Sequence, residues 1–294
     1  MTATVTRLEP PVTASSPPGS RPGQQRRPRR RRPSVPLGAV LAWAVVAVVL
    51  LWAFFPGVFA PHDAYASVTR GLHPPSAEFP FGTDTNGRDL FSRVVHGASE
   101  SLAGALVAVT VGLSAGTLLG VLAGSVGGIV EDGIMRVVDV LLSIPGLLLA
   151  LTVVVLLGPG TVNAALAVGI GAVASFARLV RSEVVQVRGT DYVEAAYGSG
   201  GRLLPVLWRH VLRNSLRPVV ALAALQFGAA ILALSTLGFL GYGVTPPEPE
   251  WGMIIAQGRD LLGAAWWVTT LPGLVIVAVV LSANRLSRSL GSER

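Results

Sequence analysis

The chain has 294 residues, of which 51% are hydrophobic and only 13% are charged, and its mean hydropathy is +0.60. Because about a quarter of the residues in a soluble domain are charged, this composition excludes an ordinary soluble protein and indicates an integral membrane protein. All 23 basic residues are arginine, so the chain cannot supply the lysine of a Walker A motif, a Schiff base or a kinase site. The absence of cysteine excludes disulfides, thiolate metal sites and thiol nucleophiles.

The net charge of +7 is concentrated at the N-terminus, where residues 1–36 hold eight arginines and one acidic residue. This segment has too little apolar surface to order itself, and we predict a disordered Arg/Pro-rich tail in the cytoplasm. A secretory signal is the alternative, but the apolar run that follows is longer than the apolar region of a signal peptide. We interpret the arginines as an orientation signal on anionic lipid rather than as a nucleic-acid site.

Apolar runs of about 20 residues, the length that a helix needs to cross a bilayer, recur along the rest of the chain. We therefore predict an all-α integral membrane protein with six transmembrane helices, at Leu37–Phe55, Leu102–Gly124, Ile134–Leu157, Val162–Val180, Val219–Gly241 and Ala265–Ala283. The last five form a core at residues 101–286.

The distribution of charge predicts which connecting segments are cytoplasmic. With both termini inside, residues 178–217, which carry seven arginines and three acids, lie in the cytoplasm, as does the tail 287–294. Residues 56–100 and 242–264 are then extracytoplasmic and together hold four arginines and eight acids. The excess of arginine on the inside follows the positive-inside rule for a multi-pass protein of the cytoplasmic membrane.

Small residues recur at every fourth position of the second predicted span: Gly104, Ala108, Gly112, Gly116, Gly120, Gly124 and Gly128. Such a stripe lets another helix backbone approach closely, where dispersion drives helix association in lipid. We expect the stripe to pack within the same chain, and an interface with a partner subunit is the alternative.

The third predicted span contains Asp139, the only acidic residue well inside a span. Arg136 lies three residues earlier on the same helical face, so a local ion pair is expected, and Pro145 should kink this helix. Other polar residues at mid-span can line a translocation path or form hydrogen bonds between helices; they are Thr117, Asn163, Ser175, Gln226, Ser235 and Thr236.

The cytoplasmic loop 181–217 interrupts the apolar pattern with a segment, Thr190–Arg217, that hydrocarbon could not hold. Asp191 and Glu194 have the spacing of a capping-box variant, which predicts the start of a short helix. Its small, mostly apolar surface consists of Tyr192, Val193, Ala195 and Ala196, and its end is marked by Gly198, Gly200 and Gly201. An arginine-faced helix at the membrane surface should follow, with Leu204, Leu207, Trp208, Val211 and Leu212 opposite Arg202, Arg209, Arg213 and Arg217.

The run EAAYGSG at Glu194–Gly200 resembles the EAA loop of ABC-importer permeases. In that family the short helix that starts at this motif docks on an ATPase subunit. The resemblance therefore implies an ATPase-coupling role for Asp191, Tyr192, Glu194, Ala195, Ala196, Gly198 and Gly200. From this motif alone, a surface helix between two spans is an equal alternative.

Three further motifs occur in the order expected for permeases of the dipeptide, oligopeptide and nickel importer family. FGTDTNGRDLFSR at Phe81–Arg93 resembles the signature ahead of that family's second span, and GFLGYGVTPPEPEWG at Gly238–Gly252 resembles its last external segment. RHVLRN at Arg209–Asn214 resembles RHVLPN. The chain is thus similar to this family over most of its length, which implies the type I ABC-importer permease fold and a bacterial cytoplasmic membrane.

The resemblance implies a permease subunit that forms half of a translocation pathway for short peptides, with nickel or another small solute as the alternative. Its implied partners are a second, similar permease, two ATPase subunits and an extracytoplasmic substrate-binding protein. ATP and magnesium would bind in the ATPases, with no cofactor and no catalysis in this subunit. An ion-coupled secondary transporter would need more intramembrane charge than Asp139, and no catalytic constellation supports an intramembrane enzyme.

The chain departs from the family pattern at a few positions. Arg213 replaces the proline of RHVLPN, so the second cytoplasmic helix can run on toward Pro218, and Gly198 replaces a bulkier residue in the EAA turn. The family's acidic C-terminal motif is replaced by ANRLSRSLGSER. The arginine-rich N-terminus has no counterpart.

The remaining candidate chemistry lies in the external FGTD motif. Its candidate residues are Gly82, Thr83, Asp84, Gly87, Arg88 and Asp89. We expect the two acids and the arginine to form a structural salt-bridge cluster rather than to contact substrate. No two of the four histidines have metal-ligand spacing, so no metal site is predicted.

Overall fold

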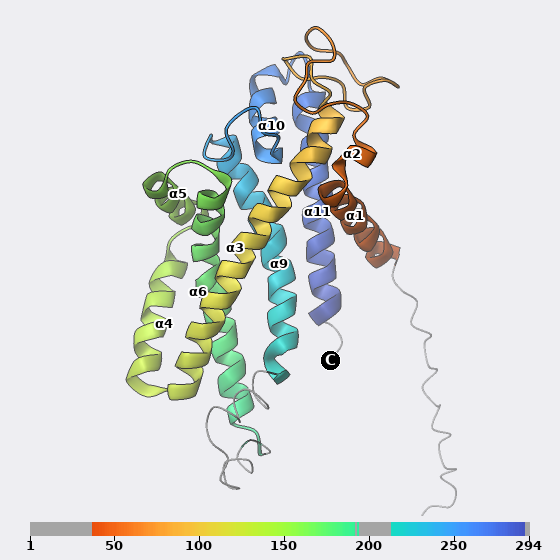
Figure 1. Ribbon diagram of the computed structural model, residues 1–294. Coiled ribbons are helices and arrows are strands. Elements are labelled where there is room, and N and C mark those ends of the chain that lie inside the picture. The colour runs from red at the N-terminus through yellow and green to blue at the C-terminus, as the bar shows by residue number, and fades with distance from the viewer. Residues whose placement is uncertain (1–36, 192, 194–212, 292–294) are drawn as a thin grey trace, which may run out of the picture. The chain divides into compact units, whose positions relative to one another are not determined.

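The computed structural model describes residues 37–191, 193 and 213–291 (Figure 1). The regular structure of these residues is helical, apart from a bridge between Thr83 and Asp89. The helices are α1 (Leu37–Phe54), α2 (Pro56–Phe59), α3 (Leu90–Val126), α4 (Gly128–Ser143), α5 (Gly146–Leu157), α6 (Thr161–Arg188), α9 (Arg213–Phe239), α10 (Trp251–Gly258) with a 3₁₀ turn at Arg259–Leu261, and α11 (Trp267–Gly291). The predicted all-α class is confirmed.

Five of the described helices are long and apolar enough to cross a membrane: α1, α3, α6, α9 and α11. The consecutive helices α4 and α5 pass the same test as a pair, bent by 96° at the break between them, and would make a sixth span. In α1 only 17% of the apolar window is buried within the chain, so most of this helix presents apolar side chains outward. Such surface is stable only against lipid or another apolar partner.

The break between α4 and α5 replaces the single kinked helix expected at Ile134–Leu157. Pro145 is the N-cap of α5, and Ile144 before it is extended, with φ −87° and ψ 129°. Proline disfavours helical geometry in the preceding residue and has no N–H to donate. The result is a sharp bend rather than a kink.

Two helices differ from expectation because acidic side chains cap them. The second span begins at Leu90 rather than at Leu102, because the Asp89 carboxylate accepts a hydrogen bond from the Ser92 N–H at 3.1 Å and starts α3 there. In the external segment 242–264, Glu250 starts α10 in the same way. The first three turns of α3 therefore belong to a helix rather than to the loop 56–100.

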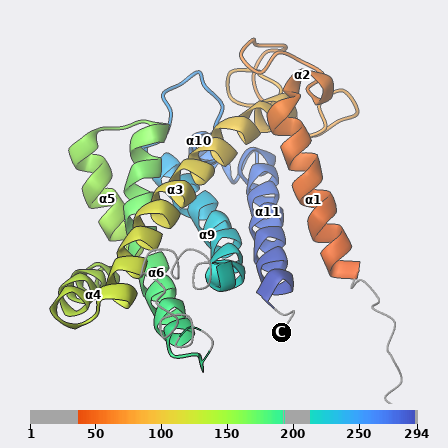
Figure 2. The ribbon, with the colours of Figure 1, turned by 60° about the horizontal axis from the view of Figure 1, so that its bottom comes forward.

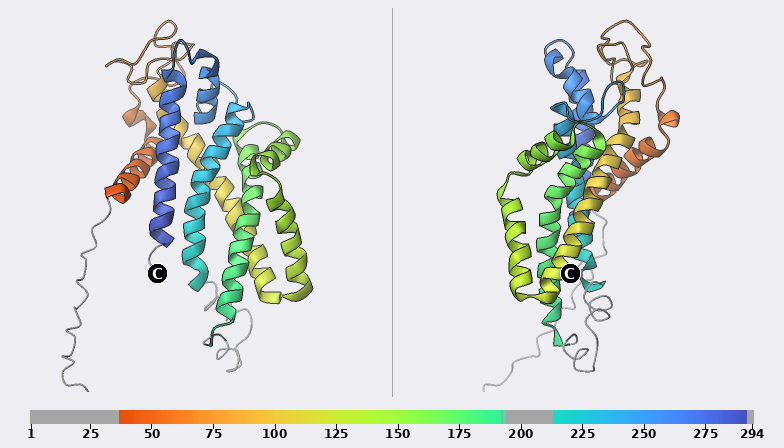
Figure 3. Two further views of the ribbon diagram at one scale, coloured as in Figure 1. Left: turned by 180° about the vertical axis from the view of Figure 1, so that it is seen from behind. Right: turned by 60° about the vertical axis from the view of Figure 1, so that its left-hand side comes forward.

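Within residues 37–291, the helix ends fall into two groups (Figures 1 and 3). The loop between α2 and α3, α10 and the start of α11 lie at one end. The α3–α4 turn, the end of α6, the start of α9 and the end of α11 lie at the other. Viewed from that second end, α3 runs diagonally across the bundle (Figure 2) and contacts α1, α6, α9 and α10.

Candidate functional site

The seam between α3 and α6 is formed by the glycine stripe. A Cβ built on Gly112 would lie 2.6 Å from the Cβ of Ala172, and one on Gly120 would lie 2.7 Å from the carbonyl oxygen of Ala177. Gly116 and Gly124 meet α6 in the same way. The stripe thus allows two backbones to touch from Gly112 to Gly124, about three helical turns, within this chain. Gly128, by contrast, faces open space.

At its end the seam is held by two arginines of α6, Arg188 and Arg181, which we call the arginine clamp. Arg188, the last residue of α6, donates from Nη1 to the carbonyl oxygens of Gly124 at 2.7 Å and Ser125 at 2.6 Å. These are carbonyls of the last turn of α3, which have no partner within their own helix. About two helical turns before Arg188, Arg181 of α6 donates from Nε to Glu131 of α4 at 2.6 Å. The end of α6 is therefore fastened to both α3 and α4.

The predicted coupling residues directly follow this clamp. Asp191 is exposed and Val193 is fully buried. Tyr192, Glu194, Ala195, Ala196, Gly198 and Gly200 lie outside the described residues, as does most of the predicted arginine-faced helix. Its continuation at Arg213 is helical and runs through Pro218 as the start of α9.

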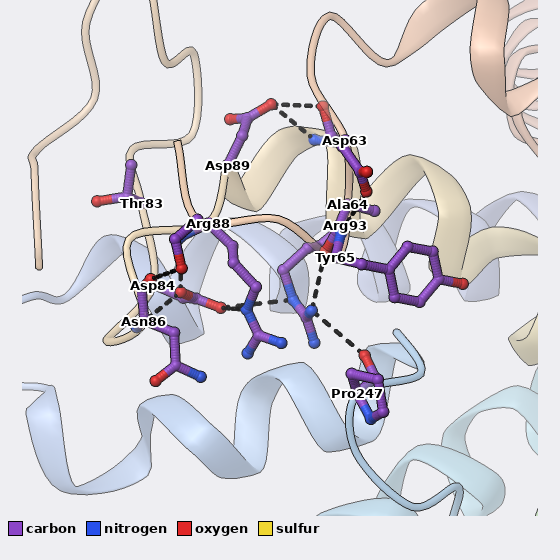
Figure 4. A network of polar contacts seen from close by, with 12 residues as sticks. Asp63, Ala64, Tyr65, Thr83, Asp84, Asn86, Arg88, Asp89, Arg93 and Pro247 are labelled. Atoms are coloured by element: carbon purple, nitrogen blue, oxygen red, sulfur yellow. Dashed lines mark hydrogen bonds and ion pairs between the residues drawn. The ribbon is translucent and has the colours of Figure 1, made fainter. Parts of the chain in front are cut away.

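At the opposite end, Asp84 is the centre of the FGTD network (Figure 4). Its Oδ1 accepts hydrogen bonds from the N–H groups of Asn86 and Arg88, both at 2.9 Å. Its Oδ2 accepts from Arg88 Nε at 2.8 Å and forms an ion pair with Arg93 Nε at 3.5 Å. Arg93 is fully buried and donates from Nη1 to the carbonyl oxygen of Ala64 at 3.1 Å. One carboxylate thus holds two buried arginines.

The expected three-residue cluster needs correction, because Asp89 does not join it. Its Oδ2 accepts from Ser92 Oγ at 2.6 Å and lies 3.4 Å from His62 Nδ1. The third member of the cluster is Arg93, at the end of the same motif. Asp89 caps α3 because it lies directly before the first residue of that helix. Arg93 lies one turn into α3, and its side chain reaches back to Asp84 in the loop.

Two glycines let the FGTD loop fold this tightly. Gly82 has φ +74° and Gly87 has φ +73°, in the left-handed region that side chains rarely adopt. A Cβ on Gly82 would also lie 2.6 Å from the carbonyl oxygen of His73 and 2.7 Å from Trp267 Nε1. Thr83 between them accepts from the His73 N–H at 2.7 Å and donates to Gly71 O at 2.9 Å.

Glu250 joins three helices beneath this loop. Its carboxylate accepts from the N–H groups of Gly252 at 2.8 Å and Met253 at 2.9 Å, and from Ser101 Oγ of α3 at 3.4 Å. Gly238 of α9 packs directly on the same carboxylate. Burial raises the pKa of the Glu250 carboxyl, and the two backbone hydrogen bonds oppose this shift. Sequence reasoning missed this residue, although an acid directly before an apolar run is a helix-start signal.

Two clefts lie beside the α4–α5 bend. The first, of about 590 Å³, is bordered by α3, α4, α5, α6 and α9, and Gln226 is among its polar residues. The second, of about 620 Å³, lies between α4, α6, α9 and α11 and is lined by Arg178. Leu142 and Ser175 line both, so the two clefts adjoin.

Asp139 forms an ion pair with Arg178 of α6 rather than with Arg136. The expectation of a pair within the helix is therefore wrong. The α3–α6 seam and the Glu131–Arg181 pair hold α4 beside α6, so a cross-helix partner reaches Asp139. Sequence spacing cannot reveal this pairing, because the two residues belong to different helices.

Four of the six polar mid-span residues divide into two groups, whereas the hydroxyls of Thr117 and Ser235 are buried without a hydrogen-bond partner among the described residues. Ser175 and Gln226 line the clefts. Thr236 donates to Leu232 O in its own helix, and Asn163 donates to Leu157 O and Gly158 O at the end of α5. Among the residues that the structure describes, no group of three or more His, Cys, Asp and Glu side chains could hold a metal ion.

Comparison with known proteins identifies the family. Residues 116–291 match the model of the binding-protein-dependent transport system inner membrane component. This range includes the end of the α3–α6 seam, the bent α4–α5 pair, Arg181 and Arg188, and the helices α9, α10 and α11. The chain belongs to this family. It is therefore a multi-pass membrane component of an ABC importer, which works with ATPase and substrate-binding partners.

Curated family members match along most of this permease chain. A probable D,D-dipeptide transport system permease protein, DdpC of Escherichia coli, is 41% identical over 85% of this chain and 84% of its own length. The di/tripeptide transport system permease protein DppC of Pseudomonas aeruginosa is 40% identical over 86% and 85%. The glutathione transport system permease protein GsiD of Pectobacterium atrosepticum is 37% identical over 86% and 84%.

Among solved structures, the family fold is found in the MetNI methionine ABC transporter in an inward-facing conformation. The TM-score is 0.54 at 20% identity, and the match covers 67% of this chain and 96% of that chain. This similarity supports the type I ABC-importer fold.

Proposed function

We propose that this permease imports short peptides. The observation that carries the proposal is that relatives at 37–41% identity, matched over most of their length, are named for dipeptides, di/tripeptides and glutathione. These solutes share a peptide backbone and differ in their side chains. The apolar first cleft, with its few polar residues, suits a pathway that tolerates variable side chains.

The subunit forms half of the translocation pathway and pairs with a second, similar permease. Two ATPase subunits bind ATP and magnesium in the cytoplasm, because this lysine-free chain has no Walker A lysine of its own. An extracytoplasmic binding protein delivers the peptide to the end that carries the FGTD loop and α10. The excess of arginine in residues 1–36 and 178–217 supports cytoplasmic N- and C-termini.

Coupling to the ATPases runs through the segment that begins at Asp191. Arg188 fastens the start of this segment to the end of α3, and Arg181 fastens the same helix to α4. A force applied to the segment therefore reaches three helices at once. Since α4 is bent against α5 beside the clefts, displacement of α4 changes the shape of the pathway.

The test is uptake by the complete importer in proteoliposomes. Radiolabelled dialanine should accumulate only with ATP inside and binding protein outside, and unlabelled dipeptides, tripeptides and glutathione should compete. Competition by nickel alone, with no effect of peptides, would assign the importer to a metal substrate. Uptake that persists without ATP and follows an ion gradient would contradict an ABC mechanism.

A further inference from the structure

The ion pair between Asp139 and Arg178 lies where a lipid-facing helix surface would not carry charge. Asp139 lies about 12 Å further along α4 than Glu131, at 1.5 Å per residue, and Arg178 lies about 15 Å back from Arg188 along α6. Arg178 belongs to α6, a candidate membrane span, and Asp139 belongs to α4, the first helix of the bent α4–α5 pair that meets the span criteria only as a pair. Charged side chains in such spans face a water-filled cavity or a protein partner.

The pair is nevertheless open to its surroundings. The Arg178 side chain is 56% exposed and that of Asp139 is 63% exposed. Arg178 lines the second cleft, directly beside Ser175, which lines both clefts. The exposed guanidinium of Arg178 therefore borders the second cleft.

The guanidinium has hydrogen-bonding capacity to spare. Within the described residues, Arg178 donates through Nη2 to Asp139 Oδ1, whereas a guanidinium carries five N–H donors. A second carboxylate can therefore bind the same group, and Arg–carboxylate pairs are commonly bidentate. Asp139 fixes the orientation of Arg178 and prevents its charge from being left unpaired between substrates.

The residues that line the clefts are suited to bind the terminal carboxylate of a peptide rather than its side chains. The first cleft is lined mainly by alanine, glycine, valine and leucine, with Ser143, Ser175 and Gln226 as polar side chains. Small apolar walls do not discriminate strongly among side chains. A feature common to short unmodified peptides is the terminal carboxylate, and Arg178 is a described cation that lines the second cleft, which adjoins the first.

We propose that Arg178, oriented by Asp139, binds the terminal carboxylate of the peptide as the peptide passes through the adjoining clefts. The proposal rests on the proposed function of peptide import. It assigns a specificity role to one residue pair, independent of the side chains of the peptide and of the binding protein.

The first experiment asks whether the clefts are aqueous and anion-attracting. The chain has no cysteine, so Ser175→Cys introduces a single thiol, which is labelled in the complete importer assembled with cysteine-free partners. The anionic reagent sulfonatoethyl methanethiosulfonate should react, and Arg178→Gln should lower its rate several-fold relative to neutral methyl methanethiosulfonate. A thiol that reacts with neither reagent, with and without ATP and vanadate, would contradict an aqueous cleft.

The second experiment asks whether the attracted anion is the peptide terminus. Dialanine at millimolar concentration should protect the thiol from labelling in at least one nucleotide state, and dialanine amide should protect much less. Arg178→Gln should remove this difference and lower dialanine uptake roughly tenfold or more, since a charged hydrogen bond is lost. Equal protection by acid and amide would overturn the proposal.

The control is an arginine on the same helix as Asp139 that lines neither cleft. Arg136→Gln replaces this exposed residue of α4. It should leave the labelling ratio and the acid-to-amide difference unchanged. If this control alters the ratio as much as Arg178→Gln does, the ratio does not report on Arg178 and the proposal fails. If wild-type importer takes up peptides but shows no protection, this inference fails while the proposed function stands.

Discussion

Gly116 of α3 lies so close to Phe176 of α6 that a Cβ on the glycine would be 2.5 Å from the Cβ of the phenylalanine. The neighbouring carbonyl of Val173 would be 2.6 Å away. Because one obstacle is backbone, side-chain rotation cannot relieve the clash. The contact fixes the spacing of α3 and α6.

Replacing Gly116 by valine should therefore separate α3 from α6. We expect a loss of about 1–3 kcal/mol of folding free energy from overpacking and a lower thermal unfolding midpoint of the purified importer. Gly133→Ala is the matched control, since a Cβ there meets nothing within 4 Å and alanine favours a helix. A valine variant as stable as wild type would mean that the seam tolerates a wider spacing.

Removing the Asp84 carboxylate should lower the folding free energy more than the replacement of Gly116 by valine does. Asp84→Ala leaves Arg88 and Arg93 buried without their shared counter-ion, and losing one partner of a buried pair costs about 3–5 kcal/mol. We expect little assembled importer in the membrane, measured by quantitative immunoblot. Asp260→Ala, at an 84% exposed carboxylate paired with Arg259 at 3.5 Å, should change stability by no more than about 0.5 kcal/mol.

Replacing Arg188 by glutamine should impair coupling more than assembly. The variant loses the charged hydrogen bonds to Gly124 O and Ser125 O, about 1.5–3 kcal/mol, and releases the end of α6 from α3. We expect ATP hydrolysis to continue while peptide uptake per ATP falls. The control is Arg136→Gln, at an exposed residue of α4, which should preserve the ratio. An unchanged ratio in the Arg188 variant would exclude the clamp from coupling.

Glu250 makes stability depend on pH. Its folded-state pKa is raised above the ordinary value of about 4.5, so the folded protein holds this proton at pH values where the unfolded chain has lost it. Stability from this group is therefore complete below pH 4.5 and falls as pH rises toward the folded pKa. The difference in unfolding midpoint between wild type and Glu250→Gln should move in favour of the glutamine variant over that interval. A difference independent of pH would contradict a buried, protonatable carboxyl.

Composition, hydropathy and motif order were sufficient to predict an all-α membrane protein of the permease family with six spans, of which the structure shows five as long helices and one as the bent α4–α5 pair. These properties are local or additive: a span needs about 20 apolar residues, and the FGTD and EAA motifs are contiguous in the chain. The glycine stripe likewise predicted a close helix contact from its four-residue period.

Tertiary structure was needed to decide which residues act together. Asp139 forms an ion pair with Arg178 of another helix rather than with Arg136 of its own helix. Asp84 forms an ion pair with Arg93, whereas Asp89 caps α3. Each pairing depends on how two separate elements pack, and the energy of a buried or intramembrane charge depends on that packing rather than on sequence separation. The order of residues therefore determined the spans and the family, and the folded chain determined where the charges meet and which of them border the clefts.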